Sequence, residues 1–213
     1  GDPEPIKFRY FISSYPKAVK ESFRVWKAVP RTVLWLFVVQ VAVMFGMSMT
    51  SVMNAIYATK ELGIPEELWW LTFVPLLVAM IVMSIPIGKM VDKIGRKTPL
   101  MLGVVVFAAA ALIFTVGNLV TVMIAMALLA MGQLFVMAST MALSADLVDP
   151  VNRGKVVGFR NFVGYIFNGF GMLLGSYLYV EVFPQLPFYT TFLLMFPTPV
   201  SYTHLRAHET VLD

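Results

Sequence analysis

Two long charge-free runs on either side of one basic turn constrain this chain more than any other feature. Residues 69–87 and 100–116 contain no Asp, Glu, Lys or Arg, and the turn 88–99 between them carries four cations. A run of about 20 apolar residues is long enough to cross the roughly 30 Å hydrocarbon core of a bilayer as a helix. The sequence therefore predicts that both runs span a membrane and that the turn lies at its surface.

The distribution of positive charge predicts which surface this is. Short cytoplasmic loops of membrane proteins carry an excess of Lys and Arg. Fourteen of the 16 Lys and Arg residues fall within residues 1–31, 88–100 and 144–160, whereas the segment 57–67 has one cation and three anions. We therefore expect the first three segments on the cytoplasmic side of the cell membrane and the segment 57–67 outside.

The composition supports a membrane protein and excludes several other classes. The chain is 59% hydrophobic and 13% charged, whereas a soluble domain has about 25% charged residues. The net charge of +4 lies in membrane-flanking segments, so we expect the lipid bilayer, and no nucleic acid, as a partner. The chain has no Cys, which removes disulfides and thiolate metal sites. We expect no metal and no cofactor.

The pattern of charge-free runs predicts an all-α fold, a polytopic membrane helix bundle within residues 32–200. Five full spans and a truncated sixth are expected, at residues 33–54, 69–87, 100–116, 119–143, 157–180 and 186–200. Trp69 and Trp70 stand where an aromatic belt belongs. Within the fifth span, Gly171 and Gly175 form a small-xxx-small pair that lets two helices approach closely.

Both ends of the chain are expected to lie outside this bundle. Residues 1–31 are basic, and apolar residues recur in them at helical spacing, which predicts an amphipathic helix at the headgroup level. Residues 201–213 interrupt the sixth span with polar residues and hold both histidines. They resemble the translation of a sequencing adapter, so we expect a non-native tail. The chain begins without Met, and we expect it to be a fragment.

The turn also carries a motif, which reads Gly-x3-Asp-x2-Gly-Arg-Lys-x2-Leu from Gly88 to Leu100. This motif resembles the loop signature of the major facilitator superfamily, found between the second and third helices of each six-helix half. The string around Asp146, Arg153 and Gly154 resembles the sequence that commonly follows the fourth helix of a half. The resemblance implies a secondary transporter that binds its small-molecule substrate between two such halves, near the bilayer midplane.

The residues of the motif suit distinct physical roles. Gly88 lets the end of one helix lie close to its neighbour, and Gly95 allows a tight turn. Asp92 can accept hydrogen bonds from the amide end of an adjacent helix. Arg96 and Lys97 face phosphate headgroups or a carboxylate. Our hypothesis is that Asp92 and Arg96 form part of an inner conformational latch that favours the outward-facing state.

Within the resemblance, the chain corresponds to one half, and we favour the C-terminal half. The basic segment before the first span is similar to the end of the loop that joins the halves. Many N-terminal halves have an Arg four residues before a Gly in the fourth helix, but here Leu128 precedes Gly132. The other six-helix half is then a required partner. Because the spans contain no carboxylate, a residue that couples transport to protons would lie in that half.

Uncharged polar residues at membrane depth are the candidates for the transport pathway. Ser and Thr are discounted because in membrane helices they usually bond their own backbone. Asn and Gln are costlier in lipid, although hydrogen bonding between helices explains each of them equally well. The candidates are Gln40, Asn54, Gln133, Tyr165 and Asn168.

Two alternatives to transport stay open. A membrane-embedded enzyme needs nucleophiles, bases or metal ligands that converge at membrane depth, but the spans contain no Cys, Asp, Glu or His. We therefore expect no catalytic residue and no enzyme. A non-transporting receptor on the same fold has no distinguishing sequence feature. Substrate, coupling ion and direction of transport also stay open.

Overall fold

The computed structural model describes residues 31–195 of the 213-residue chain. These residues form helices and no strand: α2 (Arg31–Ser51), α3 (Met53–Lys60), the 3-10 helix η1 (Glu66–Thr72), α4 (Phe73–Ile94), α5 (Lys97–Phe114), α6 (Leu119–Leu147), α7 (Pro150–Glu181) and α8 (Leu186–Met195). The predicted amphipathic segment and the predicted non-native tail lie outside the described residues, apart from Arg31 at the start of α2.

Five helical stretches of the described chain are long and apolar enough to cross a membrane. They are Val33–Ser51, Glu66–Ile94, Lys97–Phe114, Leu119–Leu147 and Pro150–Glu181. The helix α8 is also apolar but shorter, since its described part ends at Met195. The predicted all-α polytopic bundle is thereby confirmed.

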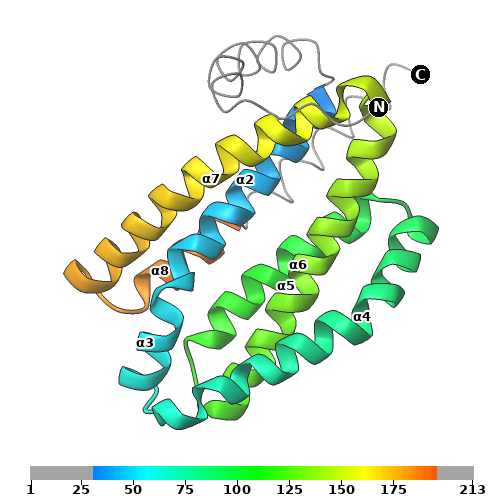
Figure 1. Ribbon diagram of the computed structural model, residues 1–213. Helices are drawn as coiled ribbons and strands as arrows, with labels where there is room; N and C mark the ends of the chain where they lie inside the picture. The colour runs from blue at the N-terminus through cyan, green and yellow to red at the C-terminus, as the bar shows by residue number, and fades with distance from the viewer. Residues whose placement is uncertain (1–30, 196–213) are drawn as a thin grey trace, which may run out of the picture.

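The helices form two groups that meet at α8. On one side α2 runs along α7, and on the other side α4 and α5 pack against α6 (Figure 1). The helix α8 contacts both α2 and α5. A buried cluster that includes Val43, Phe107, Val136 and Met195 fills the space where α2, α5, α6 and α8 converge. Apolar packing therefore links the two groups at α8, whereas α6 and α7 touch little along their length.

Glycines allow close helix contacts on both sides. A Cβ atom on Gly103 of α5 would lie 3.0 Å from the carbonyl oxygen of Gly132 of α6, and the reverse holds at the same distance. On the other side, a Cβ on Gly171 of α7 would lie 2.8 Å from the Phe45 carbonyl oxygen. Without a hydrophobic force between helices in lipid, such close backbone approach supplies much of the packing attraction.

The two predicted inner loops are mostly helical, which corrects the sequence-based expectation. The helix α4 continues through residues 88–94, and only Gly95 and Arg96 separate it from α5. Likewise, only Val148 and Asp149 separate α6 from α7. Cations draw a segment to the headgroups but do not end a helix. The first break comes instead at Gly95, whose φ of +88° disfavours residues with a side chain.

The first predicted span, residues 33–54, is also corrected, because it breaks at Val52 between α2 and α3. Hydroxyl groups in the last turn of α2 bond to its own carbonyl groups. The Ser48 hydroxyl donates to the Phe45 carbonyl at 2.7 Å, and the Ser51 hydroxyl donates to the Ser48 carbonyl at 3.0 Å. Such hydrogen bonds compete with the helical ones and bend helices.

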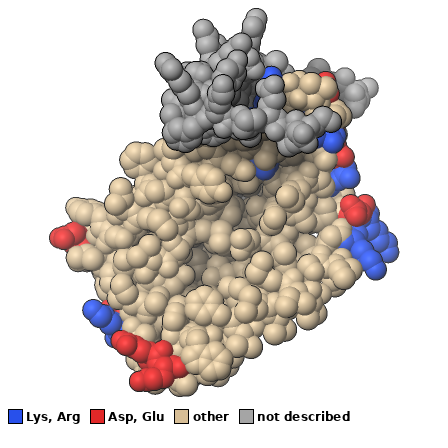
Figure 2. Space-filling view, viewed as in Figure 1, with Lys and Arg blue, Asp and Glu red and all other residues tan. Residues whose placement is uncertain are grey.

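Charged side chains gather at two opposite ends of the bundle, with an uncharged surface between them (Figure 2). We call the end that holds the α4–α5 and α6–α7 turns the basic end, and the end that holds the turns after α3 and α7 the acidic end. The described cations of the basic end include Lys89, Lys93, Arg96, Lys97, Arg153 and Lys155. The described anions of the acidic end are Glu61, Glu66, Glu67 and Glu181.

Candidate functional site

A cavity of about 600 Å³ lies between the two helix groups. Three amide side chains line it, and each comes from a different helix: Asn54 from α3, Gln133 from α6 and Asn168 from α7. Three of the five candidate pathway residues are thus brought together. The volume falls within the roughly 300–1,000 Å³ of sites that enclose small molecules.

The depth of these amides follows from their place in the helices. Gln133 lies at the middle of α6, and Asn168 lies slightly beyond the middle of α7. Asn54 follows the break at Val52, which ends α2 beside the cavity. An amide that faces hydrocarbon without a partner costs several kcal/mol, on the order of 4–8. Lining a cavity at membrane depth gives all three side chains access to water or solute.

A second set of polar residues lines the cavity and was not predicted from the sequence. The hydroxyl side chains of Ser48, Thr50 and Ser51 border the cavity while bonding backbone carbonyl groups of α2. The expected backbone bonding therefore occurs, but it does not keep these residues out of the cavity. The signal available in the sequence is their clustering within four residues at the end of the span.

The rest of the lining is apolar and carries no charge. Thioethers come from Met44, Met47, Met126 and Met172, and Trp69 and Phe73 contribute aromatic rings near the acidic end. Among the lining residues none is Asp, Glu, Lys, Arg or His. The cavity of this part of the chain thus combines neutral hydrogen-bonding groups with polarizable apolar walls.

The other two pathway candidates do not line this cavity. Gln40 lies in α2 and is half-buried, and its side-chain oxygen is buried without a hydrogen-bond partner in the described residues. Tyr165 lies on α7 with 69% of its surface exposed. The structure therefore separates these two residues from Asn54, Gln133 and Asn168.

At the basic end, an ion pair joins Arg96 to Asp146. Arg96 caps the N-terminus of α5, and Asp146 lies in the last turn of α6. The two side chains are 36% and 42% exposed, so water weakens their attraction. The pair connects the two sequence motifs and fixes the α4–α5 turn to the end of α6.

Two expectations for the α4–α5 motif are not met within residues 31–195. Asp92 is exposed and makes no hydrogen bond to a helix amide there. The N-terminus of α7 is instead capped locally by Asp149, which accepts a hydrogen bond from the Val151 amide at 3.1 Å. A Cβ on Gly88 would meet nothing within 4 Å, so the predicted close approach is absent. Lys97 is exposed at the first position of α5.

The α6–α7 turn is closed by Arg153. Its Nε donates to the Val148 carbonyl at 3.0 Å, and a terminal nitrogen donates to the Ala145 carbonyl. Both acceptors lie at the C-terminal end of α6, where a cation is favoured by the helix dipole. Gly154 is exposed on α7, with nothing within 4 Å of a Cβ placed there.

The small-xxx-small pair lies where α7 meets α2. Gly171 and Gly175 are buried, and a Cβ on Gly175 would overlap the carbonyl group of Met49. These glycines set the distance between α2 and α7. They thereby position Asn168 relative to the end of α2.

No group of three or more His, Cys, Asp or Glu residues that would hold a metal ion occurs between residues 31 and 195. The chain matches the family model of the Major Facilitator Superfamily over residues 36–211. The match extends into the segment expected to be a non-native tail, and that expectation stays a prediction. Among curated proteins none matches the chain.

Proposed function

The chain belongs to the major facilitator superfamily, and we propose that it forms one six-helix half of a transporter that moves a small solute by alternating access. The family is one of transporters, and five apolar helices make the chain a multi-pass membrane protein. The observation that carries the proposal is the cavity at membrane depth into which Asn54, Gln133 and Asn168 converge. We assign no catalytic role to any residue.

The mechanism we propose needs a second six-helix half. In secondary transporters of this kind, two halves rock against each other around a solute held near the bilayer midplane. The cavity lies between the two helix groups of this half, and Gln133 lies at the middle of its helix. We keep the C-terminal half as the assignment, so that the missing wall of the pathway comes from the N-terminal half.

The lining supports a solute without net charge. A charge that left water for this cavity would meet no opposite charge among the described lining residues, and its desolvation would cost several kcal/mol. An uncharged solute with hydroxyl or amide groups would instead exchange hydrogen bonds with Gln133 and Asn168. Its apolar surface would pack on Met172 and Trp69.

We place the basic end of the bundle in the cytoplasm and the bundle in the cell membrane. The described cations support this orientation, because six of them lie in or beside the α4–α5 and α6–α7 turns. The acidic end would then face outward, with Trp69 and Trp70 of η1 at the outer interface.

The ion pair between Arg96 and Asp146 changes the hypothesis of a latch at the basic end. Arg96 and Asp146 belong to the same half, so their pair makes this end rigid but does not itself join two halves. Asp92 is exposed on the last turns of α4. We propose that its carboxylate meets the other half at the basic end and favours the outward-facing state.

Cysteine labelling tests the pathway, and the chain suits it because it contains no Cys. We expect Gln133→Cys and Asn168→Cys in the full-length protein to react with a water-soluble thiol reagent in membranes open on both sides. The matched control is Val105→Cys, since Val105 is 51% exposed on α5 at a depth where lipid excludes water. Equal labelling of all three positions, or of none, would exclude this cavity as the transport pathway.

The same reagents test the orientation on intact cells. We expect Glu67→Cys at the acidic end to be labelled from outside, and Lys93→Cys at the basic end to be labelled only after permeabilisation. Both native residues are exposed, so access to the membrane side decides the result. The opposite pattern would reverse the orientation while leaving the pathway result intact.

A further inference from the structure

Arg160 of α7 is a buried cation, and the described residues bond to few of its hydrogen-bond donors. Its exposed fraction is 9%. One terminal nitrogen donates to the Ser144 hydroxyl of α6 at 3.2 Å, and the buried Nε has no partner among residues 31–195. A guanidinium offers five N–H groups and no acceptor. Most of its donors are therefore left for another group.

The charge of Arg160 has no counter-ion in the described residues. The ion pair found there joins Arg96 to Asp146 and does not involve Arg160. A buried charge without a partner is strongly unfavourable, so buried Arg residues are almost always paired. Within the part of the chain that the structure describes, one neutral hydroxyl group bonds this side chain, which indicates that an anion occupies the site in the working protein.

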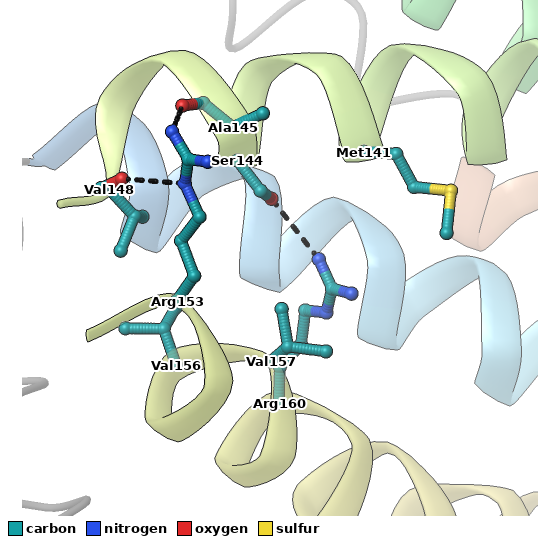
Figure 3. A pocket seen from close by; sticks show the side chains of 8 residues that line it. All are labelled: Met141, Ser144, Ala145, Val148, Arg153, Val156, Val157 and Arg160. Carbon is teal, nitrogen blue, oxygen red and sulfur yellow. Dashed lines mark hydrogen bonds between the residues drawn. The ribbon is translucent and has the colours of Figure 1, made fainter. Parts of the chain in front are cut away.

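A pocket of about 230 Å³ opens beside this side chain, between α6 and α7 (Figure 3). Ser144, Arg153 and Arg160 supply its polar groups, and Met141, Val148 and Val157 are among its apolar lining residues. It is smaller than the roughly 300 Å³ at which sites for drug-sized ligands begin. The space suits one small anionic group with an apolar part beside it.

The two arginines of the pocket have different tasks. Figure 3 shows the Arg153 guanidinium turned to the end of α6, where it donates to the carbonyl groups of Val148 and Ala145. The Arg160 guanidinium lies deeper along α7 and points toward Ser144. Arg153 thus closes the turn, and Arg160 supplies the donors that face a ligand.

We propose that this pocket binds a phosphate group, with Arg160 as its principal ligand and Ser144 as a second one. A planar guanidinium matches the geometry of phosphate and forms paired charge-assisted hydrogen bonds with it. The pocket lies at the basic end of the bundle, and basic pockets between membrane helices hold lipid headgroups. The phosphate comes either from an anionic phospholipid, whose glycerol and acyl carbons meet the apolar wall, or from free phosphate.

The test measures binding to the full-length protein in detergent. The probes are short-chain phosphatidylglycerol, short-chain phosphatidylcholine and inorganic phosphate, and the readouts are native mass spectrometry and the shift in Tm. We expect phosphatidylglycerol to bind the wild type and to raise its Tm. Loss of two or more charge-assisted hydrogen bonds in Arg160→Gln should weaken this binding by about tenfold or more.

Lys93→Gln is the matched control, because it removes one positive charge from the same end of the bundle outside the pocket. It should bind phosphatidylglycerol like the wild type. Val157→Phe is the second variant, which keeps Arg160 but fills the pocket, and it should also lose binding. This variant decides the result if Arg160→Gln does not fold.

A comparison of the probes shows whether the phosphate group comes from a lipid or from free phosphate. Arg160-dependent binding of phosphatidylglycerol alone assigns a lipid headgroup, whereas an equal Arg160-dependent effect of inorganic phosphate assigns a free anion. Equal binding of phosphatidylglycerol by the wild type, Arg160→Gln and Val157→Phe would overturn the proposal. So would the absence of binding by both phosphatidylglycerol and phosphate.

Discussion

Arg96 and Asp146 form an ion pair across fifty residues of sequence, from the turn before α5 to the last turn of α6. Neither residue is buried, and each belongs to a different sequence motif. The α4–α5 turn therefore has its position fixed by α6, which also carries Gln133 in the cavity. The pair links the geometry of the basic end to the helix that lines the proposed pathway.

A charge exchange tests this pair. We expect Arg96→Asp and Asp146→Arg each to lower the Tm of the purified protein, because each places two like charges side by side. The double variant should recover most of the loss. For a pair as exposed as this one, the coupling free energy should be about 0.2–1 kcal/mol. Additive losses in the double variant would show that the pair does not stabilise the fold.

A substitution at Gly175 tests the contact between α2 and α7. A Cβ there would overlap the Met49 carbonyl group, so Gly175→Ala must push the two helices apart. We expect a loss of about 1–3 kcal/mol in the free energy of unfolding, measured by denaturant titration in detergent micelles.

Gly169 of the same helix provides the control, because a Cβ at that position would meet nothing within 4 Å. Gly169→Ala should leave stability unchanged or raise it by up to about 1 kcal/mol, since Ala favours the helix. Equal losses for the two variants would contradict the close approach at Gly175.

The membrane spans could be predicted from the sequence, but which face of each helix is buried could not. In a soluble protein, polar residues mark the solvent side of a helix. In lipid both sides are apolar, so Val104 and Val105 of α5 look alike in sequence although their exposed fractions are 0% and 51%. This is why Gln40 and Tyr165 could not be separated from Gln133 in advance.

The long-range contacts could not be predicted from the sequence for a related reason. Charge placed both motifs at one surface, but no local signal predicts the pairing of Arg96 with Asp146. Nor does one predict that Arg160 has no carboxylate partner among residues 31–195. The lengths of the turns were also hidden, because Lys89 and Lys93 suit a helix as well as a loop. Within the α4–α5 turn, Gly95 carries the visible reason to end a helix.

Removal of the Gln133 amide tests the proposed solute site. In the full-length protein, Gln133→Ala should raise the KM for uptake by roughly two- to tenfold, because a neutral hydrogen bond contributes about 0.5–1.5 kcal/mol. The control is Tyr165→Phe, which removes a polar group from an exposed position outside the cavity. It should leave the KM unchanged, and an equal effect of both changes would argue against this cavity as the binding site.

Neutralisation of Asp92 tests the latch. Asp92 is exposed at the basic end, so Asp92→Asn should fold and insert normally while losing its attraction to the other half. We expect uptake to slow by up to about fivefold, the factor that corresponds to roughly 1 kcal/mol for an exposed charge contact. When Lys93→Cys is combined with Asp92→Asn, its labelling from the inner side should increase, because the outward-facing state is less favoured. Glu67→Gln at the acidic end is the control and should change neither measurement, whereas unchanged uptake and labelling in Asp92→Asn would exclude Asp92 from the latch.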